Sequence, residues 1–316
     1  WVKQRYDLVV AKEMINFVPG IVPGIGMAMN CFTQKGDKVM IQPPVYHPFA
    51  WVTTRNERTL VTNPLKWENG MYRMDLDTFR EQIKGCKLFI LCNPHNPGGV
   101  VWTEAELRAI ADICYDEKVL VFSDEIHADL TLPPHTHRPF ATVSEKARMN
   151  SVTFMSPSKA FNMPGLSASH ALIFNEDLRK RFRIYMDAGE LDMGHVFAFL
   201  SVEAAYSHGT EWLDQCLAYI QGNIDFVDDF LKNHAPKIKA IRPEASYLVW
   251  LDCRELELSQ KDLNEFFVDK AHLALNDGEM FGKEGIGFMR LNVASPRCII
   301  EKAMKQLADA YQLYIK

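Results

Sequence analysis

A lysine between two serines is the residue whose setting in this sequence most indicates chemistry. The stretch SPSKAFNMPG, residues 156–165, places Lys159 just after an apolar run and just before a Pro-Gly pair. A lysine amine can attack the carbonyl carbon of a substrate or of a pyridoxal cofactor. Ser156 and Ser158 carry hydroxyl groups that could hold a phosphate. Because short motifs match by chance, this interpretation of Lys159 depends on whether other sites agree with it.

Two further motifs directly follow apolar runs that are typical of strands. In SDEIH, residues 123–127, Asp124 ends such a run, and ligands of open α/β sheets bind at the carboxyl ends of the strands. Asp124 could keep a pyridine nitrogen protonated, or it could cap the next segment. In NPHNPGG, residues 93–99, Asn96 could donate a hydrogen bond to a cofactor's ring oxygen. Asn-Pro and Pro-Gly pairs also mark turns that hold no ligand.

Three more positions have a functional and a structural interpretation each. VPGIG, residues 22–26, opens a predicted helix whose free amides could bind phosphate, although Pro and Gly also start helices without ligands. Tyr46, in PPVYHPF, could stack on a planar cofactor or pack on the core. Arg290 lies in the apolar run GFMRLNVA, where a charge is costly unless it is paired. A substrate carboxylate or an internal ion pair would stabilise it.

The elements that position these residues alternate between strand and helix. The helical patterns cover residues 24–32, 75–84 and 103–117, and Thr103 and Glu106 form a capping box at the start of the third. Continuous apolar runs of strand length suit a parallel sheet covered on both faces. Together they predict an α/β fold with a mainly parallel sheet. The predicted strands are residues 37–43, 58–64, 87–94, 118–125 and 151–156.

After residue 174 the pattern changes to long helices, at 176–188 and at 195–234 with a break near 207–211. Shorter units follow, including a helix at 259–270 and a terminal helix. We therefore expect a large domain over residues 1–222 and a smaller C-terminal α/β domain over 223–316. The chain has no initiator Met and starts in a helical pattern, so we expect an N-terminal part to precede it.

Composition narrows the class of protein. The net charge is −5 and there is no Lys/Arg block, which argues against a nucleic-acid partner. No apolar run reaches the ~20 residues of a membrane span. Seven cysteines without a CxxC pair favour a reducing cytoplasm over a disulfide framework or a zinc ribbon. The spacing of His127, His135 and His137 permits metal ligands, but their Pro-rich stretch predicts a solvated loop and no metal site.

Taken in their order along the chain, which they cover almost completely, the six sites resemble those of the fold-type I pyridoxal 5′-phosphate (PLP) enzymes, the aspartate aminotransferase superfamily. That order is the helix start at 22–26, Tyr46, Asn96, Asp124, Lys159 and Arg290. Within this superfamily, the chain is most similar to the MalY/PatB-type cystathionine β-lyases, or C–S lyases. That similarity is carried by FVPGIVPGI, QPPVYHPF, LFILCNPHNPGG, SDEIHADL and SPSKAFNMPGL. The resemblance implies a three-layer PLP-dependent transferase fold and PLP as cofactor. It also implies a small amino-acid substrate and a homodimer with shared active sites.

The resemblance also implies a role for each residue. Lys159 would bond covalently to the cofactor and move the α-proton of the substrate. Asp124 would pair with the pyridine nitrogen, Asn96 would contact the ring hydroxyl, and Tyr46 would stack on the ring. Arg290 would bind the substrate carboxylate. The other implied cofactor-binding groups are His127 and, around the phosphate, Ser156, Ser158 and the amides of Gly24 and Ile25.

Two departures from aspartate aminotransferases favour the C–S lyase subgroup. His127 stands where those enzymes have Tyr, and Ser167 stands where they have a phosphate-binding Arg. We therefore expect β-elimination of cystathionine or a related cysteine S-conjugate to a thiol, pyruvate and ammonia. One alternative is a PLP-dependent class I/II aminotransferase. Another is the aminotransferase-like domain of a transcriptional regulator, against which the lack of basic segments argues.

Overall fold

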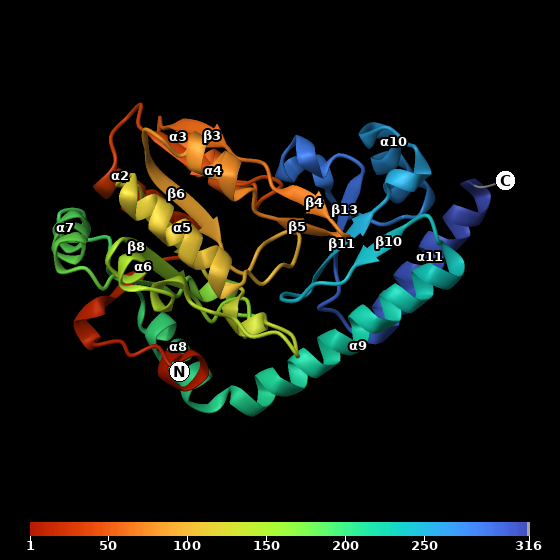
Figure 1. Cartoon of the computed structure of the whole chain (residues 1–316). Helices are drawn as coiled ribbons and strands as arrows, with labels where there is room; N and C mark the ends of the chain where they lie inside the picture. Colours follow the sequence, from red (N-terminus) through yellow and green to blue (C-terminus); the bar gives the residue numbers. More distant parts are fainter. Residues whose placement is uncertain (315–316) are drawn as a thin grey trace.

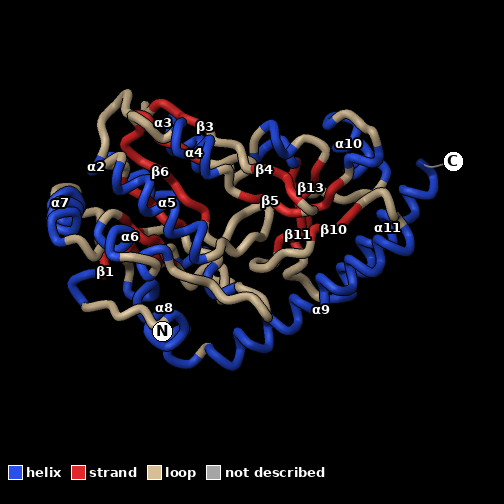
Figure 2. Tube along the Cα trace, viewed as in Figure 1, coloured by secondary structure: helices blue, strands red, loops and turns tan. Residues whose placement is uncertain are grey.

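The computed structural model describes residues 1–314 and contains two main sheets (Figures 1 and 2). The larger has seven strands in the order β1-β9-β8-β7-β6-β2-β3, and the smaller has four in the order β10-β11-β13-β12. A short hairpin of β4 (Lys66–Glu68) and β5 (Met71–Arg73) adds a third. The chain opens with α1 (Val2–Tyr6). The expected α/β architecture is therefore confirmed.

The large sheet is mainly parallel, as predicted. Strands β3, β2, β6, β7 and β8 are parallel to one another, whereas β9 pairs antiparallel with both β8 and β1. The five strands predicted from apolar runs are all present, with ends within two residues of the predicted ones. The strands are β1 (Ile15–Val18), β2 (Lys38–Ile41), β3 (Thr59–Thr62), β6 (Cys86–Cys92), β7 (Leu120–Asp124), β8 (Ser151–Met155) and β9 (Ser169–Leu172).

Helices cover both faces of this sheet, which explains why its strands are apolar without alternation. On β6, Phe89 packs in a cluster with Leu107 of α5, whereas Leu88 packs in another with Ile25 of α2. Successive strand residues thus point into opposite layers. One layer holds α4 (Leu76–Gln82), α5 (Glu104–Asp116) and α6 (Glu145–Met149), and the other α2 (Ile21–Phe32), α3 (Pro48–Arg55) and α7 (Glu176–Asp187).

The C-terminal part is built on the antiparallel small sheet. The predicted break between the long helices is at Gly209, between α8 (Val196–His208) and α9 (Thr210–His234). Helix α9 runs along both parts of the molecule, and the boundary that we propose at residues 222/223 falls inside it (Figure 1). The other elements are β10 (Lys239–Ile241), β11 (Leu248–Asp252), β12 (Asn276–Asp277), β13 (Phe288–Asn292), α10 (Gln260–Glu265) and α11 (Arg297–Tyr314).

Two helix starts affect the site or its support. The capping box of α5 is confirmed: the Thr103 hydroxyl accepts from the Glu106 N–H at 3.2 Å, and the Glu106 carboxylate accepts from the Thr103 N–H at 2.8 Å. Helix α2 starts at Ile21, three residues before the predicted start at Gly24. Gly20 makes the earlier start possible because its φ of 146° is open to glycine alone.

Gly99 ties the loop after β6 to the small domain. Its carbonyl accepts from the N–H groups of Glu244 at 2.8 Å and Ala245 at 3.1 Å. Its φ is 69°, and a Cβ at this position would lie 2.5 Å from the Pro243 Cβ. Glycine is therefore required here both for its backbone conformation and for the close approach of residue 243.

Replacing Gly99 by Ala should destabilise the fold more than the same change at Gly85. Gly85 has a similar φ of 76° but open space around it, so Gly85→Ala should cost about 1 kcal/mol for its conformation alone. Gly99→Ala should cost at least about 1 kcal/mol more, because the new methyl group meets Pro243. Urea unfolding of both variants measures this difference. Equal losses would show that the contact with residue 243 does not constrain the loop.

Candidate active site

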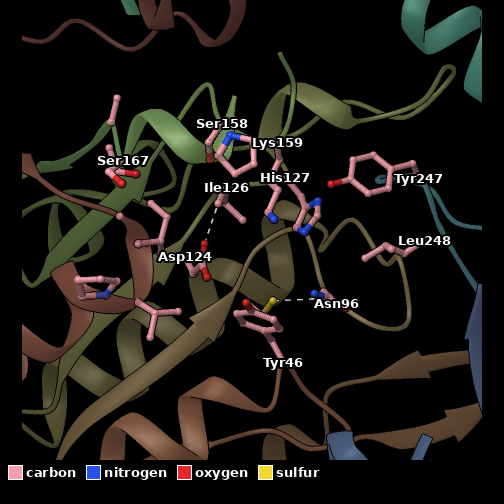
Figure 3. Close-up of a pocket in the computed structure, with 18 of the residues that line it drawn as sticks. Tyr46, Asn96, Asp124, Ile126, His127, Ser158, Lys159, Ser167, Tyr247 and Leu248 are labelled. Carbon is pink, nitrogen blue, oxygen red and sulfur yellow. Dashed lines mark hydrogen bonds between the residues drawn. The ribbon is translucent and has the colours of Figure 1, made fainter. Parts of the chain in front are cut away.

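A cavity of about 350 Å³ lies where the carboxyl ends of the central parallel strands face the small domain (Figure 3). It combines residues that are far apart in the sequence, from Pro19 to Asn292. The structure brings to this cavity most of the side chains singled out from the sequence. These are Tyr46, Asn96, Asp124, His127, Ser158, Lys159 and Arg290.

Lys159 reaches the cavity from the turn that follows β8. Ser156 stabilises this turn: its hydroxyl donates to the Ala168 carbonyl at 2.7 Å and accepts from the Ser158 N–H at 3.1 Å. Ser158 and Lys159 line the cavity, whereas Ser156 is buried next to Ser158, behind the lining residues. The unusual sequence around Lys159 therefore builds a turn that is held by hydrogen bonds.

Asp124 is a buried carboxylate without a cationic partner. It is 3% exposed, and its Oδ1 accepts from the Ile126 N–H at 3.1 Å. The capping interpretation is wrong, because the short helix that follows begins after His127 and no side chain caps it. No ion pair with Asp124 forms within residues 1–314. Burial raises the pKa of Asp124 to about 7. A cation in the cavity, such as a protonated ring nitrogen, would favour the charged carboxylate.

Arg290 presents a guanidinium without a carboxylate partner. Its Nη1 donates to Asn96 Oδ1 at 2.9 Å and its Nη2 to Asn276 Oδ1 at 2.7 Å. Its buried Nε has no hydrogen-bond partner, and the group lies 4.6 Å above the Phe281 ring. Burial lowers the pKa of Arg290 to about 10. The described part of the chain offers it no ion pair.

His127 and two tyrosines complete the polar wall. Burial, together with Lys159 and Arg290, lowers the pKa of His127 to about 3, so its ring stays neutral. Its buried Nδ1 has no partner. The Tyr247 ring meets His127 edge-on at 6.2 Å between centroids. Burial raises the pKa values of Tyr46 and Tyr247, which keeps both hydroxyl groups protonated.

The other two histidines of the Pro-rich stretch have different partners. His137 is buried, with its Nε2 2.8 Å from Glu125 Oε2, and His135 Nδ1 lies 3.7 Å from Glu244 Oε1. The prediction of a solvated loop is therefore wrong for His137, which the carboxylate of Glu125 stabilises inside the fold, and for His127, which is also buried. Within residues 1–314, no group of three or more His, Cys, Asp or Glu side chains is arranged to hold a metal ion.

The helix start at the cavity differs from the one predicted. Gly20, Ile21, Val22 and Pro23 line the cavity, whereas Gly24 and Ile25 do not. The Gly24 N–H already donates to the Gly20 carbonyl at 2.9 Å. The first-turn amides without a helical partner are therefore those of Ile21 and Val22. Gly24 serves packing instead, because a Cβ there would lie 2.9 Å from Val18 Cγ2.

Some lining residues were not assigned a role from the sequence. Ser167 was noted above only because it replaces a phosphate-binding Arg; it lines the cavity, and its backbone is in the left-handed conformation with φ of 48°. Ser169 at the start of β9 and Tyr247 before β11 line it as well. Tyr247 carried a weak signal, since it is a polar aromatic residue directly before an apolar strand.

The fold and the cavity define a PLP-dependent enzyme of fold type I, and the comparisons give the family. The model of the family "Aminotransferase class I and II" matches residues 1–307. The chain belongs to this family, whose cofactor is PLP.

Individual relatives place the chain in the cystathionine β-lyase/MalY group of these enzymes. It is 38% identical over 312 residues to cystathionine β-lyase PatB of Bacillus subtilis, covering 98% of this chain and 81% of the relative. PLP-containing cystalysin from Treponema denticola superimposes with a TM-score of 0.97 at 34% identity, covering 100% of this chain and 80% of that one. The PLP-bound C–S lyase from Staphylococcus hominis superimposes with a TM-score of 0.91 at 33% sequence identity, covering 98% of this chain and 80% of that one.

The raised pKa of Asp124 predicts how pH affects the cofactor-free protein. The folded-state value of about 7 exceeds the ordinary 3.8, so the carboxyl contributes stability at low pH that is lost as pH rises toward 7. Asp124→Asn removes this loss. The difference in free energy of unfolding between the Asp124→Asn variant and the parent, measured in urea titrations, should therefore rise by roughly 2–3 kcal/mol in favour of the variant between about pH 5 and pH 8. A difference that stays constant with pH would contradict the buried, unpaired state of Asp124.

Proposed function

We propose that this protein catalyses PLP-dependent β-elimination of cystathionine or a related cysteine S-conjugate, releasing a thiol, pyruvate and ammonia. The observation that carries the proposal is a pair of charged groups without ion-pair partners, the buried Asp124 and the half-buried Arg290, in one cavity with Lys159. A protonated ring nitrogen and an amino-acid carboxylate would satisfy these two charges. Similarity to C–S lyases supports the choice of reaction.

The residues present fit the cofactor. Lys159 would bond to its aldehyde, Asp124 would pair with the ring nitrogen, and Tyr46 would stack on the ring. Asn96 and the unpartnered Nδ1 of His127 are suited to the ring hydroxyl. For the phosphate, the groups that line the cavity are the first-turn amides of Ile21 and Val22 and the hydroxyls of Ser158, Ser167 and Ser169.

Within this frame, the side chains of the chain have separate tasks. Arg290 would bind the substrate carboxylate through a charge-assisted pair, and Asn96, already bonded to Arg290, would orient it. The Lys159 Nζ would take the α-proton, as a general base, and hold it. PLP, when bound, supplies an electron sink for the charge left on Cα. Release of that charge toward Cβ expels the thiolate.

The rival reactions share most of this site. An aminotransferase would use the same Lys159, Asp124 and Arg290. The neutral His127 and the uncharged Ser167, in place of a Tyr and an Arg, favour the lyase. A regulator domain finds no support in the net charge of −5.

Within residues 1–314, none of the helices combines the length and apolar character that a membrane crossing requires. All seven cysteines are free, which supports the proposed cytoplasmic location.

We also propose that two copies of the chain associate. Helix α8 and the turn before it expose a contiguous set of large apolar side chains, with Met193 75% and Phe197 68% exposed. Monomers seldom expose patches of this kind, and a second copy is the partner that the family resemblance implies. The set is Met193, Val196, Phe197, Phe199 and Leu200.

A charge in this patch should separate the copies. Light scattering of the parent protein should give twice the chain mass, and Phe197→Glu should give the chain mass, because the carboxylate would be buried unpaired. Leu313→Glu, at an equally exposed apolar position on α11, is the matched control and should leave the dimer intact. A dimer that persists in Phe197→Glu would place the interface elsewhere.

Pyruvate formation tests the reaction itself. The full-length protein, given PLP and L-cystathionine without a keto acid, should form pyruvate over many turnovers, since elimination needs no amino-group acceptor. Lactate dehydrogenase coupling follows the pyruvate. An absence of pyruvate, with amino-group exchange once a keto acid is added, would instead identify an aminotransferase.

A further inference from the structure

Tyr247 is a polar group of the cavity to which the proposed roles assign nothing. It directly precedes β11 of the small sheet, and its hydroxyl points into the cavity toward His127 and Lys159 (Figure 3). Within residues 1–314, this hydroxyl makes no hydrogen bond. A hydroxyl at a cavity wall without a protein partner is available to a ligand.

Tyr247 also stands where two cavities meet. A second cavity of about 420 Å³ adjoins the first and is lined in part by the aromatic residues Trp212 and Tyr219 of α9. Tyr247 and Lys159 line both cavities, whereas Tyr46 lines only the first. A substituent that extends from a substrate at Lys159 into the second cavity therefore passes Tyr247.

Apart from Lys159, which takes the α-proton, the other titratable groups around Tyr247 are unsuited to donate a proton to a leaving group. His127 is neutral, with its pKa lowered to about 3 by burial. Arg290 is bonded to Asn96 and Asn276. The Cys92 thiol is buried, donates to the Pro94 carbonyl and accepts from the Asn96 N–H. Tyr46 and Asp124 are on the side of the cavity proposed for the cofactor ring.

We propose that the Tyr247 hydroxyl protonates the sulfur of the departing thiolate. This inference rests on the proposed β-elimination. The Cα–H bond breaks as Lys159 Nζ takes the proton, the Cα=Cβ bond forms, and the Cβ–S bond breaks with its electron pair on sulfur. The Tyr247 Oη proton then moves to sulfur and completes the thiol. The phenolate takes the proton held on Lys159, so both side chains regain their starting state and no oxidant or reductant is needed.

The charges that face Tyr247 suit this cycle. Burial and the nearby Tyr46 raise its pKa, which keeps the proton on oxygen until a stronger base appears beside it. Arg290 acts in the opposite direction and would stabilise the transient phenolate. A general acid of this kind typically contributes a factor of 10²–10⁴ to the rate.

The test compares leaving groups of different basicity in the PLP-loaded enzyme. S-Ethyl-L-cysteine releases a basic thiolate that needs a proton, whereas S-(4-nitrophenyl)-L-cysteine releases a thiolate stable without one. Tyr247→Phe should lower kcat/KM roughly 100-fold with the first and less than about threefold with the second. The matched control Tyr219→Phe removes a hydroxyl of the second cavity and should show no dependence on the leaving group.

A second measurement does not use activity. The tyrosinate absorbance is titrated with pH in the parent and in Tyr247→Phe, and the difference between the two curves reports the ionisation of Tyr247. This ionisation should occur only above the ordinary tyrosine pKa of 10.0, since burial raises the pKa of this phenol. Thermal unfolding verifies that the variant is folded. Ionisation of Tyr247 well below that value would overturn the assignment, because the group would then lack its proton.

The outcomes separate the two proposals. Equal losses with both substrates, or a leaving-group dependence in Tyr46→Phe and none in Tyr247→Phe, would overturn the role of Tyr247 while β-elimination stands. An absence of pyruvate from both substrates in the parent enzyme would remove the proposed function and this inference with it.

Discussion

The parallel register of β6, β7 and β8 is the constraint on which the whole site depends. It places Cys92 opposite Asp124 and Asp124 opposite Phe154, so the three strands end side by side. The segments that leave these ends carry Asn96, His127 and Lys159. Because helices bury both faces of the sheet, these strand ends cannot shift without exposing a large apolar core. Side chains distant in sequence are thus held together before any ligand binds.

The small domain contributes the complementary charge. Arg290 lies on β13, within an antiparallel sheet that packs against α9 and α11, and its only acceptors in the described residues are two asparagine side chains. A half-buried guanidinium and a buried carboxylate that do not pair with each other both cost free energy of folding. The fold tolerates this cost at one cavity, which is the expected property of a site that becomes complete with its ligands.

The apolar runs predicted the sheet well because strands buried on both faces leave a continuous signal, and the capping box of Thr103 and Glu106 located α5. The order of motifs also predicted which side chains meet. Three features depended on information that the pattern does not carry. The start of α2 was placed at Gly24 because the unusual conformation of Gly20 is invisible in composition. The burial of His137 depends on Glu125, and the position of Tyr247 depends on how the domains pack.

The central claim is that Lys159 is the lysine that bonds to the cofactor, and borohydride reduction tests it most directly. The PLP-loaded protein is reduced, digested and analysed by mass spectrometry. The account predicts stable cofactor on the peptide that contains Lys159 and none on the Lys159→Ala variant. Cofactor trapped stoichiometrically at another lysine, and retained in that variant, would contradict the arrangement of the site described above.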